Sequence, residues 1–107
     1  MAFHGDNGLR AWINYKGNGT ASIRDSYNFS SHTDYGNGRY RFHFSTSLPS
    51  NNFCAVASAT YLIGQVRRHR IVSPYRWDTS YIEVVSGYND TTSADHEVIS
   101  VMCADSI

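Results

Sequence analysis

Residues 39–46 alternate between two kinds of side chain without interruption, and this segment constrains the fold more than any other part of the chain. Successive side chains of a strand point to opposite faces. One face of the segment would carry Tyr40, Phe42, Phe44 and Thr46, and the other Arg39, Arg41, His43 and Ser45. The period of two therefore predicts a β-strand with one apolar face and one cationic face.

Short runs of strand-forming residues separated by turn residues extend this pattern to the whole chain. Gly, Asn and Pro mark the turns, as in Lys16-Gly17-Asn18-Gly19 and Gly36-Asn37-Gly38. We expect strands at residues 10–15, 20–24, 27–32, 39–46, 53–62, 65–72, 81–86 and 95–103, with loops at 74–80 and 87–93. This pattern predicts an all-β fold, an antiparallel and jelly-roll-like β-sandwich of about seven to eight short strands.

Within these strands, alternation also predicts which side chains face the core. Ala21 and Ile23 should point inward in the second strand, and Tyr27 and Phe29 in the third. Ala55, Ala57 and Ala59 should line one side of the fifth, where another sheet or subunit could approach closely.

The length of 107 residues suits one domain. Residues 1–8 are rich in Gly, Asp and Asn, so we expect a flexible leader there and a single sandwich domain at residues 9–107. A core of this size gives only marginal stability, and association with further copies would help to stabilise the fold. The two cysteines, Cys54 and Cys103, lie in apolar strand-like runs and are interpreted as free buried residues, although a disulfide between neighbouring strands stays open.

The charge of the chain argues against a general polyanion binder. Its formal net charge is zero, and only 17% of its residues are charged, so nucleic acid is not an expected partner. No apolar run approaches membrane-spanning length, and the first ten residues carry no secretory signal. We therefore expect no membrane insertion and synthesis in a cytoplasm.

The sequence contains no recognisable catalytic or metal-binding motif. Its five histidines lack metal-ligand spacing, and no nucleophile elbow, P-loop or Cys-x-x-Cys is present. The densest carboxylates are Asp78, Glu83, Asp95 and Glu97. They could serve glycoside hydrolysis, but a solvated face or pairing with arginines is favoured. We expect a protein without enzymatic activity, cofactor or metal.

An arginine run, Arg67-Arg68-His69-Arg70, precedes the acidic last third of the chain. It could bind phosphate or carboxylate groups of a polysaccharide, because guanidinium pairs bidentately with both. It could also bind nucleic acid, which the neutral charge disfavours. The favoured interpretation pairs Arg67, Arg68 and Arg70 with the acidic third, between strands or between subunits.

Aromatic residues gather in or beside the late loops. Tyr and Trp stack on sugar rings and are favoured at interfaces. We select Tyr75, Trp77 and Tyr88 as candidate receptor-binding residues, with Asp78 and Asn89 as polar partners. The alternative is that half of these aromatics cap the core or a trimer axis.

The first half of the chain resembles a module found near the C-termini of bacteriophage tail-fibre proteins, especially those of marine phages and cyanophages. The matching residues are Ala11, Trp12, Ile13, Asn14, Tyr15, Gly17, Gly19, Thr20, Ile23, Arg24, Ser30, Ser31, Thr33, Asp34, Gly36, Gly38, Tyr40, Phe42, Phe44, Leu48, Pro49 and Asn52. The second half resembles the family only in its general pattern, in which loop-rich strands end in an apolar strand. The matched pattern is one of strands and turns, so the resemblance transfers no site residues.

The resemblance implies a protein of the virion surface. We expect a tail-fibre-type knob that forms a homotrimer, contacts other virion proteins and adheres to a host-surface receptor, either a glycan or a protein. In the family the module usually ends a longer fibre, whereas only ten residues precede it here. The alternative is therefore a structural virion component, such as a capsid-decoration or tail-junction protein, that binds no receptor.

Overall fold

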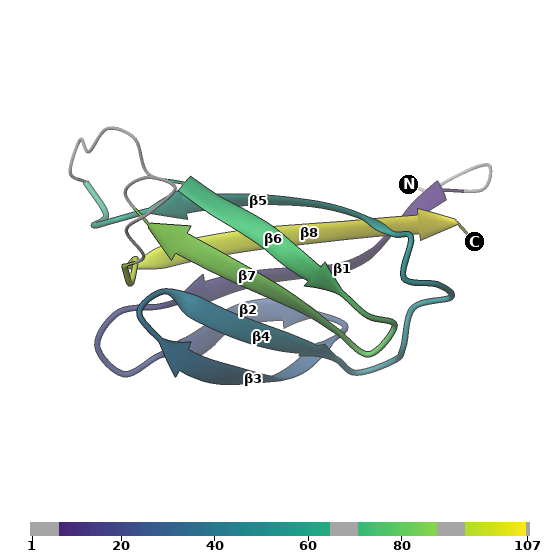
Figure 1. The fold of residues 1–107 in the computed structure, drawn as a ribbon, viewed down its shortest axis with the longest axis horizontal. Coiled ribbons are helices and arrows are strands. Elements are labelled where there is room, and N and C mark those ends of the chain that lie inside the picture. The colour runs from purple at the N-terminus through teal and green to yellow at the C-terminus, as the bar shows by residue number, and fades with distance from the viewer. Residues whose placement is uncertain (1–6, 65–70, 88–93, 107) are drawn as a thin grey trace.

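The fold was determined as a computed structural model that describes residues 7–64, 71–87 and 94–106. Eight strands make up its regular structure (Figure 1). They are β1 (Asn7–Lys16), β2 (Ser22–Tyr27), β3 (Phe29–Gly36), β4 (Arg39–Phe44), β5 (Cys54–Thr60), β6 (Ile71–Trp77), β7 (Tyr81–Gly87) and β8 (Val98–Ser106). The described part of the chain contains no helix that is long and apolar enough to cross a membrane.

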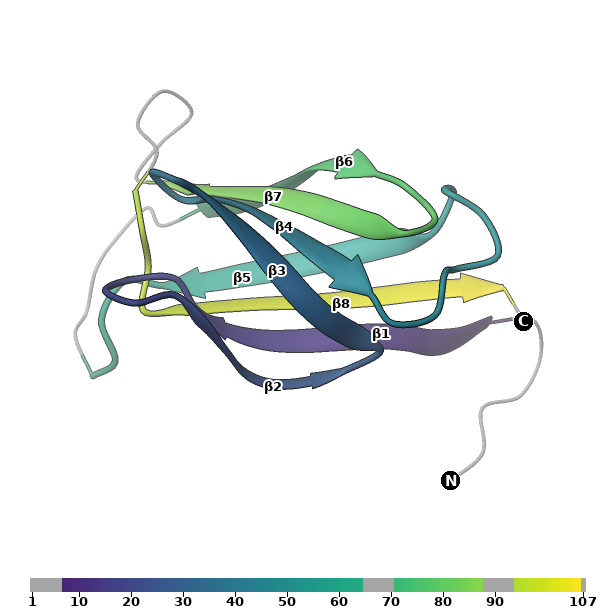
Figure 2. The ribbon, with the colours of Figure 1, turned by 90° about the horizontal axis from the view of Figure 1, so that it is seen from below.

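The strands form two four-stranded antiparallel sheets that pack face to face. Sheet A has the order β2-β1-β8-β5, and sheet B has the order β3-β4-β7-β6. Figure 2 shows the two layers edge-on, with β1 and β8 in the middle of one layer and β4 and β7 in the middle of the other. The predicted antiparallel β-sandwich is confirmed, whereas the predicted trimer stays a prediction.

The alternating segment supplies the centre of the core. Tyr40 and Phe42 of β4 are fully buried, and Tyr15 of β1 meets both rings edge-on at centroid distances of 5.0 and 4.8 Å. Edge-to-face ring pairs add stabilisation beyond the area that they bury. The buried apolar set is Ala11, Ile13, Tyr15, Phe29, Tyr40, Phe42, Phe44, Leu48, Phe53, Ile82, Val84, Ile99, Val101 and Cys103.

The hairpin turn between β3 and β4 is fixed by backbone conformation and by close packing. Gly36, Asn37 and Gly38 have φ values of 82°, 52° and 77°, which is the region that Gly and Asn tolerate best. The Gly38 amide donates to Asp95 Oδ1 at 2.8 Å, and its carbonyl accepts from the Ser86 amide at 2.8 Å. The turn predicted at this point is thus confirmed, and it is docked against the segments that flank residues 88–93.

The predicted orientation of Tyr27 is wrong. Tyr27 is the last residue of β2 and is 56% exposed, whereas Phe29 begins β3 and is 5% exposed. Asn28 stands between them with a φ of 59°, so it ends the alternation and carries the chain from sheet A to sheet B. A single strand at 27–32 would have placed both aromatic rings on one face.

Other boundaries also differ from the prediction. Residues 74–77 belong to β6 and are not a loop, because β6 is an edge strand where the missing N–H of Pro74 is tolerated. The last strand begins at Val98, so Asp95 and Glu97 precede β8 and do not share its faces. Of the predicted leader, Asn7 and Gly8 lie in β1, and residues 1–6 lie outside the described residues.

The turn between β3 and β4 yields a matched pair of variants. A Cβ at Gly38 would lie 2.4 Å from the Ala94 carbonyl oxygen, whereas a Cβ at Gly36 would meet nothing within 4 Å. Both glycines have positive φ, so Gly36→Ala should cost only about 1–2 kcal/mol of backbone strain. We expect Gly38→Ala to cost roughly 1–3 kcal/mol more in urea denaturation. Equal losses would show that the close approach at Gly38 is not made.

Candidate functional site

A buried carboxylate lies on the outer face of sheet B. Glu83 of β7 is only 3% exposed although it faces away from the core. Arg41 covers it, and the Arg41 Nε donates to Glu83 Oε2 at 2.7 Å. The Tyr75 hydroxyl donates to Oε1 at 2.8 Å, and Arg76 Nη1 lies 3.9 Å from Oε2. We call Arg41, Tyr75, Arg76, Tyr81 and Glu83 the Glu83 cluster.

The buried carboxylate of Glu83 receives its hydrogen bonds from other members of the cluster. Burial alone would raise the pKa of Glu83, but hydrogen bonds from Tyr75 and Arg41 outweigh it and lower that pKa. The same hydrogen bond raises the pKa of Arg41, whose guanidinium also lies 3.8 Å from the centre of the Tyr81 ring. Burial and the bond to Glu83 raise the pKa of Tyr75. The cluster is therefore a cross-strand brace that joins β4, β7 and β6.

The other three carboxylates of the dense acidic set have their own donors. Asp78 accepts from the Ser80 hydroxyl at 2.6 Å and from the Ser80 amide at 3.0 Å, and these bonds lower its pKa. Asp95 accepts from the Tyr40 hydroxyl and the Gly38 amide. Glu97 accepts from the Ile63 amide at 2.8 Å and lies 3.8 Å from Arg24. Each of the four carboxylates thus has a structural role at a different place.

The candidate receptor-binding residues do not share one face. Tyr75 is part of the Glu83 cluster, whereas Trp77 pairs with the core residue Ile82 and so lies on the other face of β6, 40% exposed. Asp78 lies in the turn between β6 and β7 and orders it through Ser80. The remaining candidates Tyr88 and Asn89 and the arginines Arg67, Arg68 and Arg70 lie outside the described residues.

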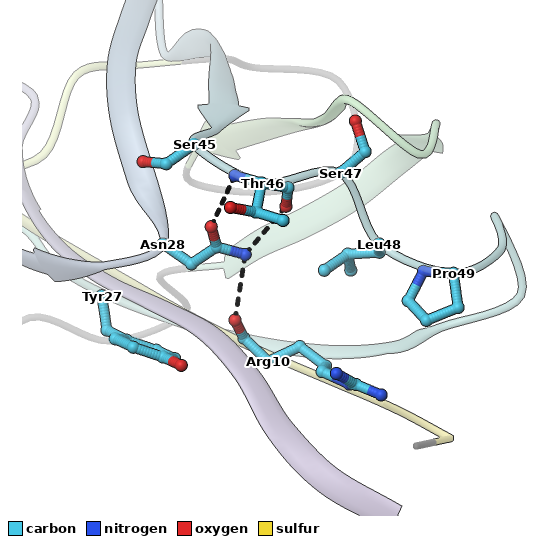
Figure 3. Close-up of a pocket in the computed structure, with 8 residues that line it drawn as sticks. All are labelled: Arg10, Tyr27, Asn28, Ser45, Thr46, Ser47, Leu48 and Pro49. Carbon is cyan, nitrogen blue, oxygen red and sulfur yellow. Dashed lines mark hydrogen bonds between the residues drawn. The ribbon is translucent and has the colours of Figure 1, made fainter.

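A pocket of about 360 Å³ opens where the β2–β3 corner meets the loop after β4 (Figure 3). It is lined by Arg10, Tyr27, Asn28, Ser45, Thr46, Ser47, Leu48 and Pro49. The hydroxyl residues at 45–47 are exposed, and Leu48 is buried beside them. We call this the Asn28 pocket.

Asn28 holds the walls of the pocket together. Its Nδ2 donates to the carbonyl oxygens of Arg10 at 3.2 Å and Thr46 at 3.0 Å, and its Oδ1 accepts from the Thr46 amide at 2.7 Å (Figure 3). The Ser45 amide donates to the Asn28 carbonyl at 3.0 Å. One side chain therefore joins β1, the β2–β3 corner and the loop after β4, and the pocket has its shape before any ligand binds.

The β6–β7 turn supports the pocket from the other side. The Leu48 amide donates to the Thr79 carbonyl at 2.9 Å, and the Phe44 amide donates to the Ser80 carbonyl at 3.0 Å. The turn that contains Asp78 thus fixes the loop that lines the pocket. Sequence reasoning missed this pocket because it placed Tyr27 in the core. The signal that could have revealed it is Asn28 itself, since Asn tolerates a positive φ between two strand-like runs.

Within residues 7–64, 71–87 and 94–106, no group of three or more His, Cys, Asp or Glu side chains is placed to hold a metal ion. The two cysteines are free, with Cys54 exposed and Cys103 buried. The expectation of two buried cysteines is thus confirmed only for Cys103, whose pKa rises to about 12, chiefly through burial.

A scan against models of known protein families found no match, and neither did searches of curated proteins and of solved structures. The resemblance to phage tail-fibre modules therefore stays a prediction from the residues quoted above. The function must be argued from the surfaces of the sandwich.

The Glu83 cluster predicts a pH dependence of stability. The folded-state pKa of Glu83 lies below its ordinary value of 4.5, so its charge contributes stability above pH 4.5, and that contribution is lost as pH falls through the folded-state pKa. We expect Glu83→Gln to lower the free energy of unfolding by about 1–3 kcal/mol at pH 7 and by progressively less below pH 4.5.

Urea denaturation across this pH range measures the effect. Asp25→Asn is the control, because Asp25 is exposed and accepts a hydrogen bond only from the adjacent Ser26 amide among the described residues. A deficit in Glu83→Gln that does not change with pH would contradict the ion-pair account.

Proposed function

We propose that the chain is a phage virion surface protein of the tail-fibre knob type. It assembles as a homotrimer, contacts other virion proteins and adheres to a host-surface glycan without performing chemistry. Two observations support the proposal: the resemblance within residues 11–52, and the preformed Asn28 pocket, which carries the argument for adhesion.

The lining of the Asn28 pocket matches the surface of a sugar. Tyr27 offers an exposed aromatic ring that can stack on the apolar face of a pyranose. Ser45, Thr46 and Ser47 offer hydroxyls that can exchange hydrogen bonds with those of the sugar. The volume of about 360 Å³ lies in the range of small-ligand pockets, roughly 300–1,000 Å³.

The same lining supports binding without reaction. Glycoside hydrolysis usually needs two carboxyl groups on either side of the scissile bond. Among the described residues that line the Asn28 pocket, none carries a carboxylate or an imidazole. The four carboxylates of the acidic set are also held by structural donors elsewhere. A ligand in the pocket would therefore be held and released unchanged.

A second candidate function is a structural virion component without receptor binding. It is favoured by the apolar outer surface of sheet A, where Val56 and Met102 are 55% and 49% exposed. Surfaces of this kind are often covered in assemblies. Virions that lack the protein but adsorb normally and lose particle stability would favour this role over adhesion.

Binding to glycan arrays and to host cells tests the adhesion proposal. Tyr27→Ala should weaken binding by about ten-fold, because it removes the stacking ring. Asn28→Gly should also weaken binding, because glycine keeps the positive φ but removes the three clamping hydrogen bonds. Both changes should leave the fold intact by circular dichroism.

Matched controls are available for each change. Tyr35→Ala removes a tyrosine that is 47% exposed on β3, and Asn37→Gly replaces an asparagine with a φ of 52° in the β3–β4 turn. Neither should alter binding. Binding that survives Tyr27→Ala but is lost in Trp77→Ala would move the site to β6. A wild-type protein that binds no glycan and no host cell would contradict adhesion.

A further inference from the structure

The outer face of sheet A carries an apolar row that crosses three strands. Trp12 of β1 pairs with Met102 of β8, and Met102 pairs with Val56 of β5. These residues alternate with the buried residues Ile13 and Val101, so they face outward. The next row is Leu9, Ala104 and Cys54. We call these two rows the β5–β8 face.

The face is shallow and open. Val56, Met102 and Cys54 are exposed, and two hollows of about 190 and 160 Å³ lie over β5 and β8. The third row, Asn14, Ser100 and Ser58, adds only uncharged polar groups. An apolar centre with an uncharged polar border is typical of an interface between proteins.

The β5–β8 face contains no charged residue, in contrast to the other face of the sandwich. The outer face of sheet B carries Arg39, Arg41, Arg76 and Glu83. In a symmetric oligomer, residues near the symmetry axis meet their own copies, so a charged face would place like charges together. Of the two outer sheet faces that the described residues form, the β5–β8 face is the one that can meet itself without that cost.

The edge formed by β5 is also less protected than the other three edges. β6 carries Pro74 and a register shift, β3 has two register shifts, and β2 has a shift in its pairing with β1 and carries Arg24 and Asp25. β5, with the sequence CAVASAT, pairs regularly along its length and has no charge and no proline. Proteins usually blunt free edges with such devices, and their absence from β5 indicates an edge that is covered.

The available area fits weak association between copies. The three strands that carry the face, β1, β8 and β5, lie about 4.8 Å apart and have roughly seven to ten residues rising about 3.3 Å each, which gives roughly 400 Å². Two such faces would bury on the order of 800 Å², the size of a small, weak interface. We infer that the β5–β8 face is the interface with a second copy of this chain. The inference rests on the self-assembly in the proposed function and adds to the trimer a two-fold contact between copies.

Solution mass tests this inference without reference to adhesion. Light scattering should give a mass that is a multiple of 12.0 kDa for the wild type. Met102→Lys places a charge at the centre of the face and should weaken association by about ten-fold or more. The control Ile71→Lys changes an apolar residue of similar exposure, 44% against 49%, on sheet B and should leave the mass unchanged.

A second variant and a chemical probe distinguish a loss of association from misfolding of Met102→Lys. Val56→Lys adds a lysine to an edge strand, where it should be tolerated, and it should also lower the mass. Cys54 is exposed and Cys103 is buried, so thiol labelling of the folded protein reports on the β5–β8 face. Labelling of the wild type should slow as protein concentration rises, and labelling of Met102→Lys should not.

The outcomes are distinct. A dimer, or a hexamer of paired trimers, that Met102→Lys or Val56→Lys dissociates supports the interface. A wild-type mass of 12.0 kDa at all concentrations overturns it, and so does an oligomer that both lysine variants leave intact. A monomeric wild type that needs Met102 to enter virions would assign the face to another virion protein. In each case glycan binding is scored separately, so adhesion can fail while the interface stands.

Discussion

The hydroxyl group of Tyr40 is the interaction on which the rest of the sandwich depends. It lies 2.6 Å from Asp95 Oδ1 and 2.8 Å from the Gly17 carbonyl oxygen, and it shares its one proton between these acceptors. The ring is fully buried between Tyr15 and Phe42, where an unpartnered phenol would be costly. Burial and then the hydrogen bond to Asp95 raise the pKa of Tyr40, so the hydroxyl stays protonated and able to donate.

This interaction closes one end of the sandwich. Asp95 also accepts from the Gly38 amide, and the Gly17 amide donates to the His96 carbonyl at 2.9 Å. The turns that follow β1 and β3 and the segment before β8 therefore meet at one point. The Asn28 clamp holds the opposite end in the same way, between β1, the β2–β3 corner and the loop after β4. Both ends are thus tied and the Glu83 cluster braces sheet B, while the Asn28 pocket and the β5–β8 face are two open surfaces among the described residues.

The sequence predicted the fold class because alternation is a local property of strands. Tyr40, Phe42 and Phe44 face the core as their spacing required, and the Gly36-Asn37-Gly38 turn lies where its residues indicated. The errors have a different origin. Tyr27 is exposed because Asn28 adopts a positive φ, and that choice follows from hydrogen bonds to Arg10 and Thr46, which are 18 residues away in either direction. Proline is typical of loops, so Pro74 predicted a loop from local sequence. It is accommodated in β6 because β6 is an edge strand.

The candidate site was harder to predict for the same reason. Its walls come from segments that meet only after the sheets have formed, and no single window of sequence contains them. The β5–β8 face likewise depends on the register of β1, β8 and β5, because Trp12, Met102 and Val56 are adjacent only across the ladder. Residue type alone suggested Tyr75 and Trp77 as receptor-binding residues. The structure places Tyr75 in the Glu83 cluster and Trp77 on the opposite face of β6.

The most direct test of this account is the free energy of unfolding of Tyr40→Phe, measured by urea denaturation beside Tyr35→Phe. The first change removes only the hydroxyl that joins Asp95 and Gly17, and the second removes a hydroxyl from a side chain that is 47% exposed. The account predicts a loss of about 1–3 kcal/mol for Tyr40→Phe, since buried acceptors lose their donor, and almost none for Tyr35→Phe. Equal stability of the two variants would contradict it.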